Sequence, residues 1–238
     1  SHLLPARPAA RPRAGLLFFG WAVRVEPSQK RAVVFVDGQN LFHAARDAFG
    51  CTFPDYDISA LARALAARHG WAPAGVRFYT GIPDAADNAR WHHFWTAKLA
   101  AMGRQGVVVF SRPLRYRNRT VRLPDGTSHV VLTGEEKGID VRIALDVIAE
   151  AHRGAYDVAL ILSQDQDLSE VATEIRVIGR EQDRWIKIAS AFPVSPAASN
   201  RRGINSTDWI PIDRALYDRC LDRRDYRAGG GATDAASQ

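Results

Sequence analysis

Residues 32–37 read Ala-Val-Val-Phe-Val-Asp, an apolar run of mostly β-branched and aromatic residues that ends in an aspartate. A second such run, Val-Ala-Leu-Ile-Leu at residues 158–162, is followed by Asp165 and Asp167. Short apolar runs without polar alternation indicate strands buried on both faces, which is typical of a parallel sheet covered by helices. The two runs therefore predict an α/β fold with a mostly parallel central sheet, and they place acidic residues just beyond two strand ends.

Strand and helix patterns alternate through the rest of the chain. We expect further strands at 76–82, 107–110, 185–191 and 209–212, and helices at 40–49, 57–69, 88–102, 138–152, 167–180 and 213–221. In the helix at 88–102, Trp91, Trp95 and Leu99 recur at every fourth position, which predicts a face packed in the core. Residues 114–132 flank Pro124-Asp125-Gly126 with partly alternating segments, so the three-layer α/β domain is expected to carry a β-hairpin insertion.

Composition divides the chain into three parts. Residues 1–30 are rich in arginine, proline and alanine and predict an N-terminal arm. Residues 31–222 contain the alternating elements and predict one globular domain, as the 46% hydrophobic content allows. Residues 223–238, which include three successive glycines, predict a flexible C-terminal tail.

The net charge of +6 is unevenly distributed, because six basic residues against one glutamate in residues 1–31 account for five of these charges. A basic surface in the domain must therefore be local. The predicted hairpin supplies the best candidate, a cluster of arginines with an interleaved tyrosine. It is either a solvated hairpin or a surface that binds a phosphate backbone; its members are Arg112, Arg115, Tyr116, Arg117, Arg119 and Arg122.

Cysteine content and hydropathy bear on location. Cys51 and Cys220 are the only cysteines, which favours a reducing compartment over a disulfide framework. The apolar run at 16–23 follows basic residues but is at the short limit for a signal peptide and lacks a small-residue cleavage site. No stretch approaches the roughly 20 apolar residues that a membrane span requires. The sequence thus predicts a cytoplasmic protein without a membrane segment.

The acidic residues are expected to meet at one rim of the sheet. Ligands of parallel sheets bind beyond the carboxyl ends of the strands, where Asp37, Asp165 and Asp167 follow their strands. A helix that crosses to the next parallel strand also begins at this edge. Glu136 and Asp140 lie at the start of such a helix, four residues apart and hence on one helical face. Five carboxylates are therefore predicted to converge.

Clustered carboxylates predict a Mg²⁺ or Mn²⁺ site, because both cations prefer oxygen ligands and are often completed by substrate phosphate. Such a site suits hydrolysis of phosphodiester bonds. Asn40, at the start of the first helix, is placed to orient a water or a phosphate. Each acid has a plainer interpretation as a helix cap or a turn residue, and in that case the domain would be a catalytically silent RNA-binding or scaffold domain.

A phosphatase of the haloacid dehalogenase type is a further alternative, because Asp165-x-Asp167-x-Ser169 follows a strand. That mechanism needs a downstream lysine and another acidic pair at strand ends. Lys187 lies inside a predicted strand and no clear acidic pair follows it, so this interpretation has less support.

Three segments resemble the signature of NYN domains, a branch of the PIN-like nuclease superfamily. They are Val-Asp-Gly-Gln-Asn-Leu at 36–41, Lys-Gly-Ile-Asp at 137–140 and Ser-Gln-Asp-Gln-Asp-Leu at 163–168, and they stand in the order and strand context of that family. The resemblance implies a PIN-like fold, dependence on Mg²⁺ or Mn²⁺, and endoribonuclease activity.

Carried over by position, the resemblance makes Asp37, Asp140 and Asp165 the metal-binding acids, with Asp167 and Asn40 as close supporters. Gln164 and Gln166 depart from the family, which usually has a small residue and a serine there. We expect these glutamines to narrow the site or to contact substrate. RNA is the expected partner, and a homodimer or a regulatory protein partner is left open.

Overall fold

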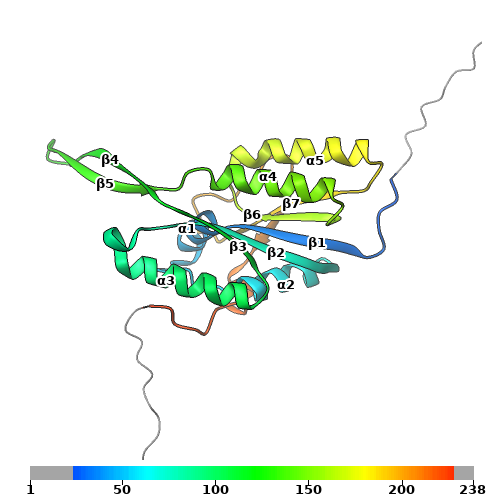
Figure 1. Cartoon of the computed structure of the whole chain (residues 1–238), viewed down its shortest axis with the longest axis horizontal. Coiled ribbons are helices and arrows are strands. Elements are labelled where there is room, and N and C mark those ends of the chain that lie inside the picture. The colour runs from blue at the N-terminus through cyan, green and yellow to red at the C-terminus, as the bar shows by residue number, and fades with distance from the viewer. Residues whose placement is uncertain (1–23, 228–238) are drawn as a thin grey trace, which may run out of the picture.

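A six-stranded sheet with every strand parallel to its neighbours runs through the molecule (Figure 1). The structure is a computed structural model that describes residues 24–227, so most of the predicted arm and tail lies outside the described residues. The strand order is β3-β2-β1-β6-β7-β8. The strands are β1 (Lys30–Asp37), β2 (Trp71–Ile82), β3 (Val108–Pro113), β6 (Val158–Leu162), β7 (Lys187–Pro193) and β8 (Asp208–Ile212).

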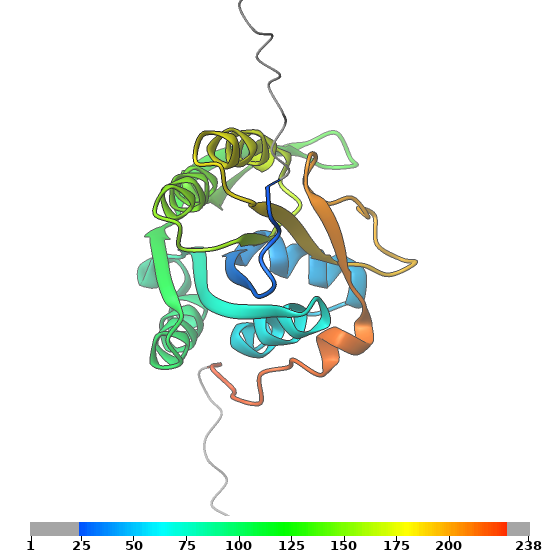
Figure 2. The same cartoon turned by 90° about the vertical axis from the view of Figure 1, so that its right-hand side faces the viewer.

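Helices cover both faces of this sheet (Figures 1 and 2). β1 divides its side chains between the two layers: Ala32, Val34 and Val36 pack in one core, and Val33 and Phe35 in the other. The first core is completed by α1 (Gly38–Phe49), α2 (Ile58–Arg68), α3 (Ala85–Arg104) and α6 (Arg214–Asp218), and the second by α4 (Ile139–His152) and α5 (Ser169–Glu181). The predicted three-layer α/β fold is confirmed.

The connections of the sheet reverse direction at its centre. From β1 the chain moves outward through β2 to β3 on one side, and it later returns to β6 and moves outward through β7 to β8 on the other. β1 and β6 are direct neighbours, paired from Ala32 with Val158 to Val36 with Leu162. Their carboxyl ends therefore form the switch point at which open α/β sheets bind their ligands.

The predicted hairpin insertion is a separate two-stranded ribbon of β4 (Arg115–Arg122) and β5 (Ser128–Glu135), which extends beyond the body of the domain (Figure 1). Its pairing fixes which side chains share a face, because residues directly opposite each other in an antiparallel pair point the same way. Arg115, Arg117 and Arg119 lie on one face, whereas Tyr116, paired with Gly134, lies on the other.

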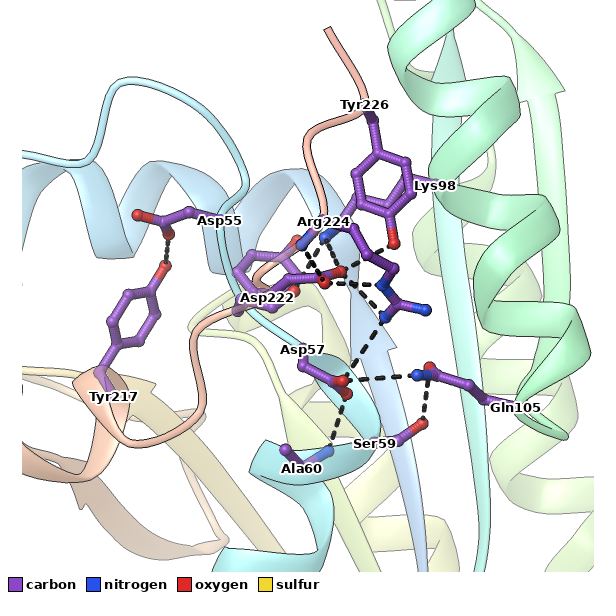
Figure 3. Close-up of polar contacts among 11 residues, drawn as sticks. Asp55, Asp57, Ser59, Ala60, Lys98, Gln105, Tyr217, Asp222, Arg224 and Tyr226 are labelled. Atoms are coloured by element: carbon purple, nitrogen blue, oxygen red, sulfur yellow. Dashed lines mark hydrogen bonds and ion pairs between the residues drawn. The ribbon is translucent and has the colours of Figure 1, made fainter. Parts of the chain in front are cut away.

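A buried lysine fastens the chain beyond α6 to the domain (Figure 3). The side chain of Lys98 on α3 is 1% exposed, and its ammonium group donates to the Tyr56 carbonyl at 2.8 Å and to Asp222 at 3.3 Å. Arg224 and the Tyr226 hydroxyl also donate to Asp222. Although the predicted tail begins at residue 223, its residues up to 227 thus contact the domain.

Several predicted element boundaries shift in the structure. β2 begins at Trp71 rather than at residue 76, because its first residues pair with Lys30 and Arg31 before a register shift next to Val33. α3 begins at Ala85, and non-helical backbone at Asn88 kinks its first turn. Among the described residues, no helix is both long and apolar enough to cross a membrane.

Candidate functional site

Asp37 is the most buried acid at the switch point, with 7% of its surface exposed. It ends β1 and caps α1, because one carboxylate oxygen accepts the Asn40 backbone N–H at 3.0 Å. Its other oxygen accepts the Ser163 hydroxyl at 3.4 Å, from the loop after β6. The Asn40 side-chain oxygen accepts the Gln164 backbone N–H at 2.9 Å and so joins the two strand ends a second time.

The loop after β6 positions Asp165 and Asp167. Ser163 accepts the Asp165 N–H at 3.1 Å, and Asp165 in turn accepts the Asp167 N–H at 3.0 Å in a 3₁₀ turn. Asp165 is half-buried, whereas Asp167 is exposed. Asp167 therefore lies at the rim of the site.

The two glutamines that depart from the family pattern point away from this rim. Gln164 donates to the carbonyls of Asn200 and Arg202, and Gln166 donates to Gly203 and accepts the Asn205 N–H. Both amides satisfy the backbone of the loop at 200–205. Their expected contact with substrate has no support in this arrangement, and the glutamines instead hold a neighbouring loop against the site.

Glu136 reaches the site by a different route from the one expected. α4 begins at Ile139, because Gly138 has a left-handed backbone conformation with φ of 74° that ends the preceding segment. Glu136 therefore lies in the link after β5, and its predicted place on the same helical face as Asp140 is wrong. Its carboxylate accepts the backbone N–H of Gly81 at the end of β2. A side chain on Gly81 would collide with Glu136, since a Cβ there would lie 2.7 Å from Glu136 Cγ.

Four of the five predicted acids influence one another electrostatically. Burial raises the pKa of Asp37 to about 6, and the nearby charges of Asp165 and Asp140 add to the rise. Burial likewise raises the pKa of Glu136 to about 7, with added contributions from Asp37 and Asp140. Asp140 lies in the first turn of α4 and is half-buried. Asp37, Glu136, Asp140 and Asp165 are hereafter the acidic site.

The predicted arginine cluster divides among several surfaces. Arg115, Arg117 and Arg119 project from one face of the ribbon, where Arg119 pairs with Glu135 at 2.8 Å. Arg112, at the end of β3, approaches the Lys137 carbonyl at 3.5 Å and so lies beside the link that carries Glu136. Arg122 is near the far end of the ribbon. The three arginines on the ribbon face thus form its main basic surface.

An aromatic cleft beside the acidic site was not predicted. Trp91 packs against the core that contains Trp95 and Leu99, as predicted, but it lies at the border of that core and is half-buried. It lines a cavity of about 570 Å³ between α1, α3 and the ribbon, together with Phe42, His43, Trp95, Leu114 and Tyr116. The four-residue spacing of Trp91 and Trp95 predicts a helix, but it carries no information on the ribbon that packs opposite this helix. The one available signal was Tyr116, an aromatic among arginines.

Comparison with known families decides the relationship. The family model described as "NYN domain" matches residues 31–193, which is more than half of the chain. The chain belongs to the NYN domain family. NYN domains are part of the PIN-like superfamily, whose members are generally nucleases, and they generally bind RNA. In this NYN domain, β8 and α6 follow the matched residues and pack on the same sheet and core.

Three solved structures are similar to this NYN domain at low sequence identity. A protein of unknown function from Vibrio parahaemolyticus is 20% identical over 80% of this chain and 98% of its own, with a TM-score of 0.48. A deacetylase of teicoplanin biosynthesis is 17% identical over 66% of this chain and 68% of its own, with a TM-score of 0.29. MurG of Acinetobacter baumannii is 8% identical over 77% of this chain and 45% of its own, with a TM-score of 0.31. No curated protein sequence matches the chain.

The donor atoms of this NYN domain fit a hard divalent cation. The acidic site offers carboxylate oxygens, and burial and like charges act against ionisation of Asp37 and Glu136, an effect that a cation would reverse. Within residues 24–227, no group of three or more His, Cys, Asp or Glu side chains is arranged so that it could hold a metal ion. Mg²⁺ usually keeps several waters and uses one or two carboxylates with substrate phosphate, so binding it would not require a group of three protein ligands.

We expect buried Asp37 to make the NYN domain less stable as the pH rises from 3.8 through about 6 in EDTA. Its pKa is higher in the folded state, which therefore holds a proton that the unfolded state has released. A difference of about two pKa units between the folded and unfolded states lowers the free energy of unfolding by about 3 kcal/mol. The whole of this loss is reached once the pH exceeds the higher of the two pKa values. Urea unfolding between pH 3.5 and 7.5 should show a shallower decline for Asp37→Asn than for wild type, and parallel profiles would contradict this.

Proposed function

We propose that the protein is a metal-dependent endoribonuclease that hydrolyses RNA phosphodiester bonds at the acidic site. The observation that supports this most strongly is the gathering of Asp37, Glu136, Asp140 and Asp165 at the switch point of a parallel sheet. Acidic residues that only cap helices do not need to lie close together. Acidic residues that bind one cation must do so.

Asp37, Asp140, Asp165 and Glu136 are the residues that would hold Mg²⁺ or Mn²⁺. Asp167, exposed at the rim, would add an oxygen ligand or accept a hydrogen bond from a water of the ion. Once bound, such a cation polarises a phosphate and lowers the pKa of a water that attacks it. The four carboxylates come from three separate parts of the sequence, the end of β1, the stretch that leads into α4 and the loop after β6.

The side chains around Asp37 keep that carboxylate in one orientation. The Asn40 N–H and the Ser163 hydroxyl occupy one lone pair on each of its oxygens. Asn40 also fixes the loop that carries Asp165, through the Gln164 N–H. Preorganisation of this kind holds the acids ready before substrate arrives. We therefore assign Asn40 to positioning the acids.

The basic face of the ribbon is proposed to hold the RNA backbone. Arg115, Arg117 and Arg119 alternate along one strand, so their Cα atoms are about 6.8 Å apart from one to the next. Phosphate contacts of this kind position a nucleic acid and make its binding sensitive to salt. Arg112, beside the link that carries Glu136, would contact the backbone closer to the acidic site. Arg122, on the opposite face at the far end of the ribbon, would contact the backbone only where it passes that end.

The proposal places the enzyme in the cytoplasm. Cys51 and Cys220 are both free thiols, and Cys220 is buried, which suits a reducing compartment. The homodimer and the regulatory protein partner stay predictions.

Cleavage of an end-labelled single-stranded RNA in Mg²⁺, Mn²⁺ or EDTA tests the function. We expect internal cuts in the presence of either cation, none in EDTA, and none from the variant Asp37→Asn. A second readout does not depend on activity: Mg²⁺ or Mn²⁺ should raise the unfolding temperature of wild type more than that of Asp37→Asn. If wild type binds the RNA but neither cuts it nor responds to a cation, the protein is the catalytically silent RNA-binding domain instead.

A further inference from the structure

The aromatic cleft and the acidic site share a boundary at Gly81. The N–H of Gly81 binds Glu136, while Gly81 itself lines the cleft. A Cβ at this position would lie 2.4 Å from Leu114 in the cleft and 2.7 Å from Glu136 in the acidic site. Gln39, two residues after Asp37, lines the cleft from the other side. A ligand that fills the cleft therefore lies directly beside the carboxylates.

The lining of the cleft suits a flat aromatic group. The rings of Phe42 and Trp91 lie 6.4 Å apart at an angle of 51°, and Tyr116 faces them from the ribbon. The cavity of about 570 Å³ falls within the range of roughly 300–1,000 Å³ that is typical of small-molecule sites. Amide side chains at its border, Gln39 and Asn88, supply donors and acceptors for the edge of a bound ring.

The ribbon separates the cleft from its basic surface. Tyr116 and Leu132 lie on the ribbon face that lines the cleft, whereas Arg115 and its neighbours at alternate positions lie on the opposite face. The Tyr116 hydroxyl accepts the Asp84 N–H at 3.3 Å, so it ties this wall to the start of α3. Arg122 shares the Tyr116 face but lies at the far end of the ribbon and does not line the cleft. Among the residues that the structure describes, the lining of the cleft contains no arginine or lysine for a phosphate, but it offers a base aromatic surfaces on which to stack.

We propose that the aromatic cleft binds an unpaired nucleobase of the RNA whose phosphate lies at the acidic site, which makes single-stranded RNA the substrate class. The inference rests on the proposed nuclease function and deepens it. Aromatic side chains bind bases of single strands by stacking, which needs a free π-face. The bases of a duplex are stacked on one another, and sequence-reading proteins accordingly use unstacked bases in loops and single strands.

Binding measurements on wild-type protein in EDTA separate this role from catalysis. The probes are a fluorescein-labelled 12-nucleotide RNA without secondary structure and the same strand annealed to its complement. We expect Trp91→Ala and Tyr116→Ala each to raise the dissociation constant for the single strand about 5- to 100-fold. The duplex should bind wild type and variants within about twofold, because its contacts are to phosphates. Trp91→Phe, which keeps an aromatic face, should restore most of the loss.

Trp185→Ala is the matched control. Trp185 is also half-buried, but it precedes β7 and contacts Lys30 at the start of β1, at the opposite edge of the sheet. This variant should bind both probes as wild type does. Because Tyr116 lies on the projecting ribbon, Tyr116→Ala tests the cleft even if Trp91→Ala lowers stability, and unfolding temperatures identify such a loss.

Unchanged binding of the single strand by both cleft variants would overturn the proposal, as would an equal loss for single strand and duplex. The two proposals fail in distinguishable ways. If the protein binds single strands through Trp91 and Tyr116 but cuts no RNA with any cation, the base-binding cleft is supported and the nuclease function is rejected. If wild type cuts RNA and the KM is unchanged in Trp91→Ala and Tyr116→Ala, the nuclease function is supported and the base-binding cleft is rejected.

Discussion

Asp140→Asn should abolish RNA cleavage in Mg²⁺ or Mn²⁺ while the protein stays folded. The Asp140 charge adds to the rise in the pKa of both Asp37 and Glu136, so this carboxylate lies near the two most perturbed acids of the acidic site. An asparagine keeps the shape but removes the negative charge that attracts a cation. Loss of partners that only support metal ligands costs about 10- to 100-fold in affinity or activity, so loss of a proposed ligand should cost at least about 100-fold.

The same change should preserve or raise the stability of the cation-free protein, because it removes repulsion among buried carboxylates. Initial cleavage rates and urea unfolding in EDTA measure the two effects separately. Glu181→Gln, a comparable change at the exposed far end of α5, is the control and should leave both unchanged. A folded Asp140→Asn protein that cuts RNA at the wild-type rate would remove Asp140 from the site.

Lys98→Met should lower the free energy of unfolding by about 3–5 kcal/mol, the usual range when one partner of a buried ion pair is removed. Lys98 and Asp222 have side chains that are 1% and 5% exposed. Burial opposes the charged form of Asp222, but hydrogen bonds from Arg224 and the charge of Lys98 outweigh it and lower the pKa of Asp222 to about 2. The variant would leave this carboxylate, and the Tyr56 carbonyl, without the buried cation (Figure 3).

Urea unfolding at pH 7 measures this loss, with Arg214→Ala as the control. Arg214 forms an ion pair with Asp218 at 2.7 Å on an exposed surface, so its removal should change stability by less than about 1 kcal/mol. Adding Asp222→Asn to Lys98→Met should recover part of the stability, since no buried carboxylate then lacks the lysine, although the ion pair of Asp222 with Arg224 is lost as well. Equal stability of Lys98→Met and wild type would mean that the lysine does not fasten the C-terminal segment.

The sheet and its acids follow from strong local patterns. The apolar runs at 32–36 and 158–162 give the two central strands directly, and element order alone places Asp37 and Asp165 at one edge. Glu136 was misplaced because the acidic residues before α4 look like a helix start, whereas the backbone of Gly138 delays the helix. The left-handed conformation of this glycine, which the acidic residues before it do not reveal, sets that boundary.

The aromatic cleft could not be predicted from local sequence patterns. Its walls come from α1, α3 and the ribbon, which are far apart in the sequence. A periodic pattern tells which face of α3 is apolar, but it does not tell whether a second element packs on that face or leaves a gap. Gln164 and Gln166 are a similar case, because their partners at 200–205 lie in a loop without a sequence pattern.

The pairing of β1 with β6 also determines when the acidic site can assemble during synthesis. Ser163 and Asp37, which meet by a hydrogen bond, are 126 residues apart. A nascent chain that has left the ribosome only as far as α4 carries Asp37, Glu136 and Asp140, but it lacks the strand that completes the central pair. Contacts of such long range form late and slow folding. Prematurely terminated products that end after α4 therefore carry three of the four carboxylates of the acidic site, and the site itself assembles only once β6 has emerged.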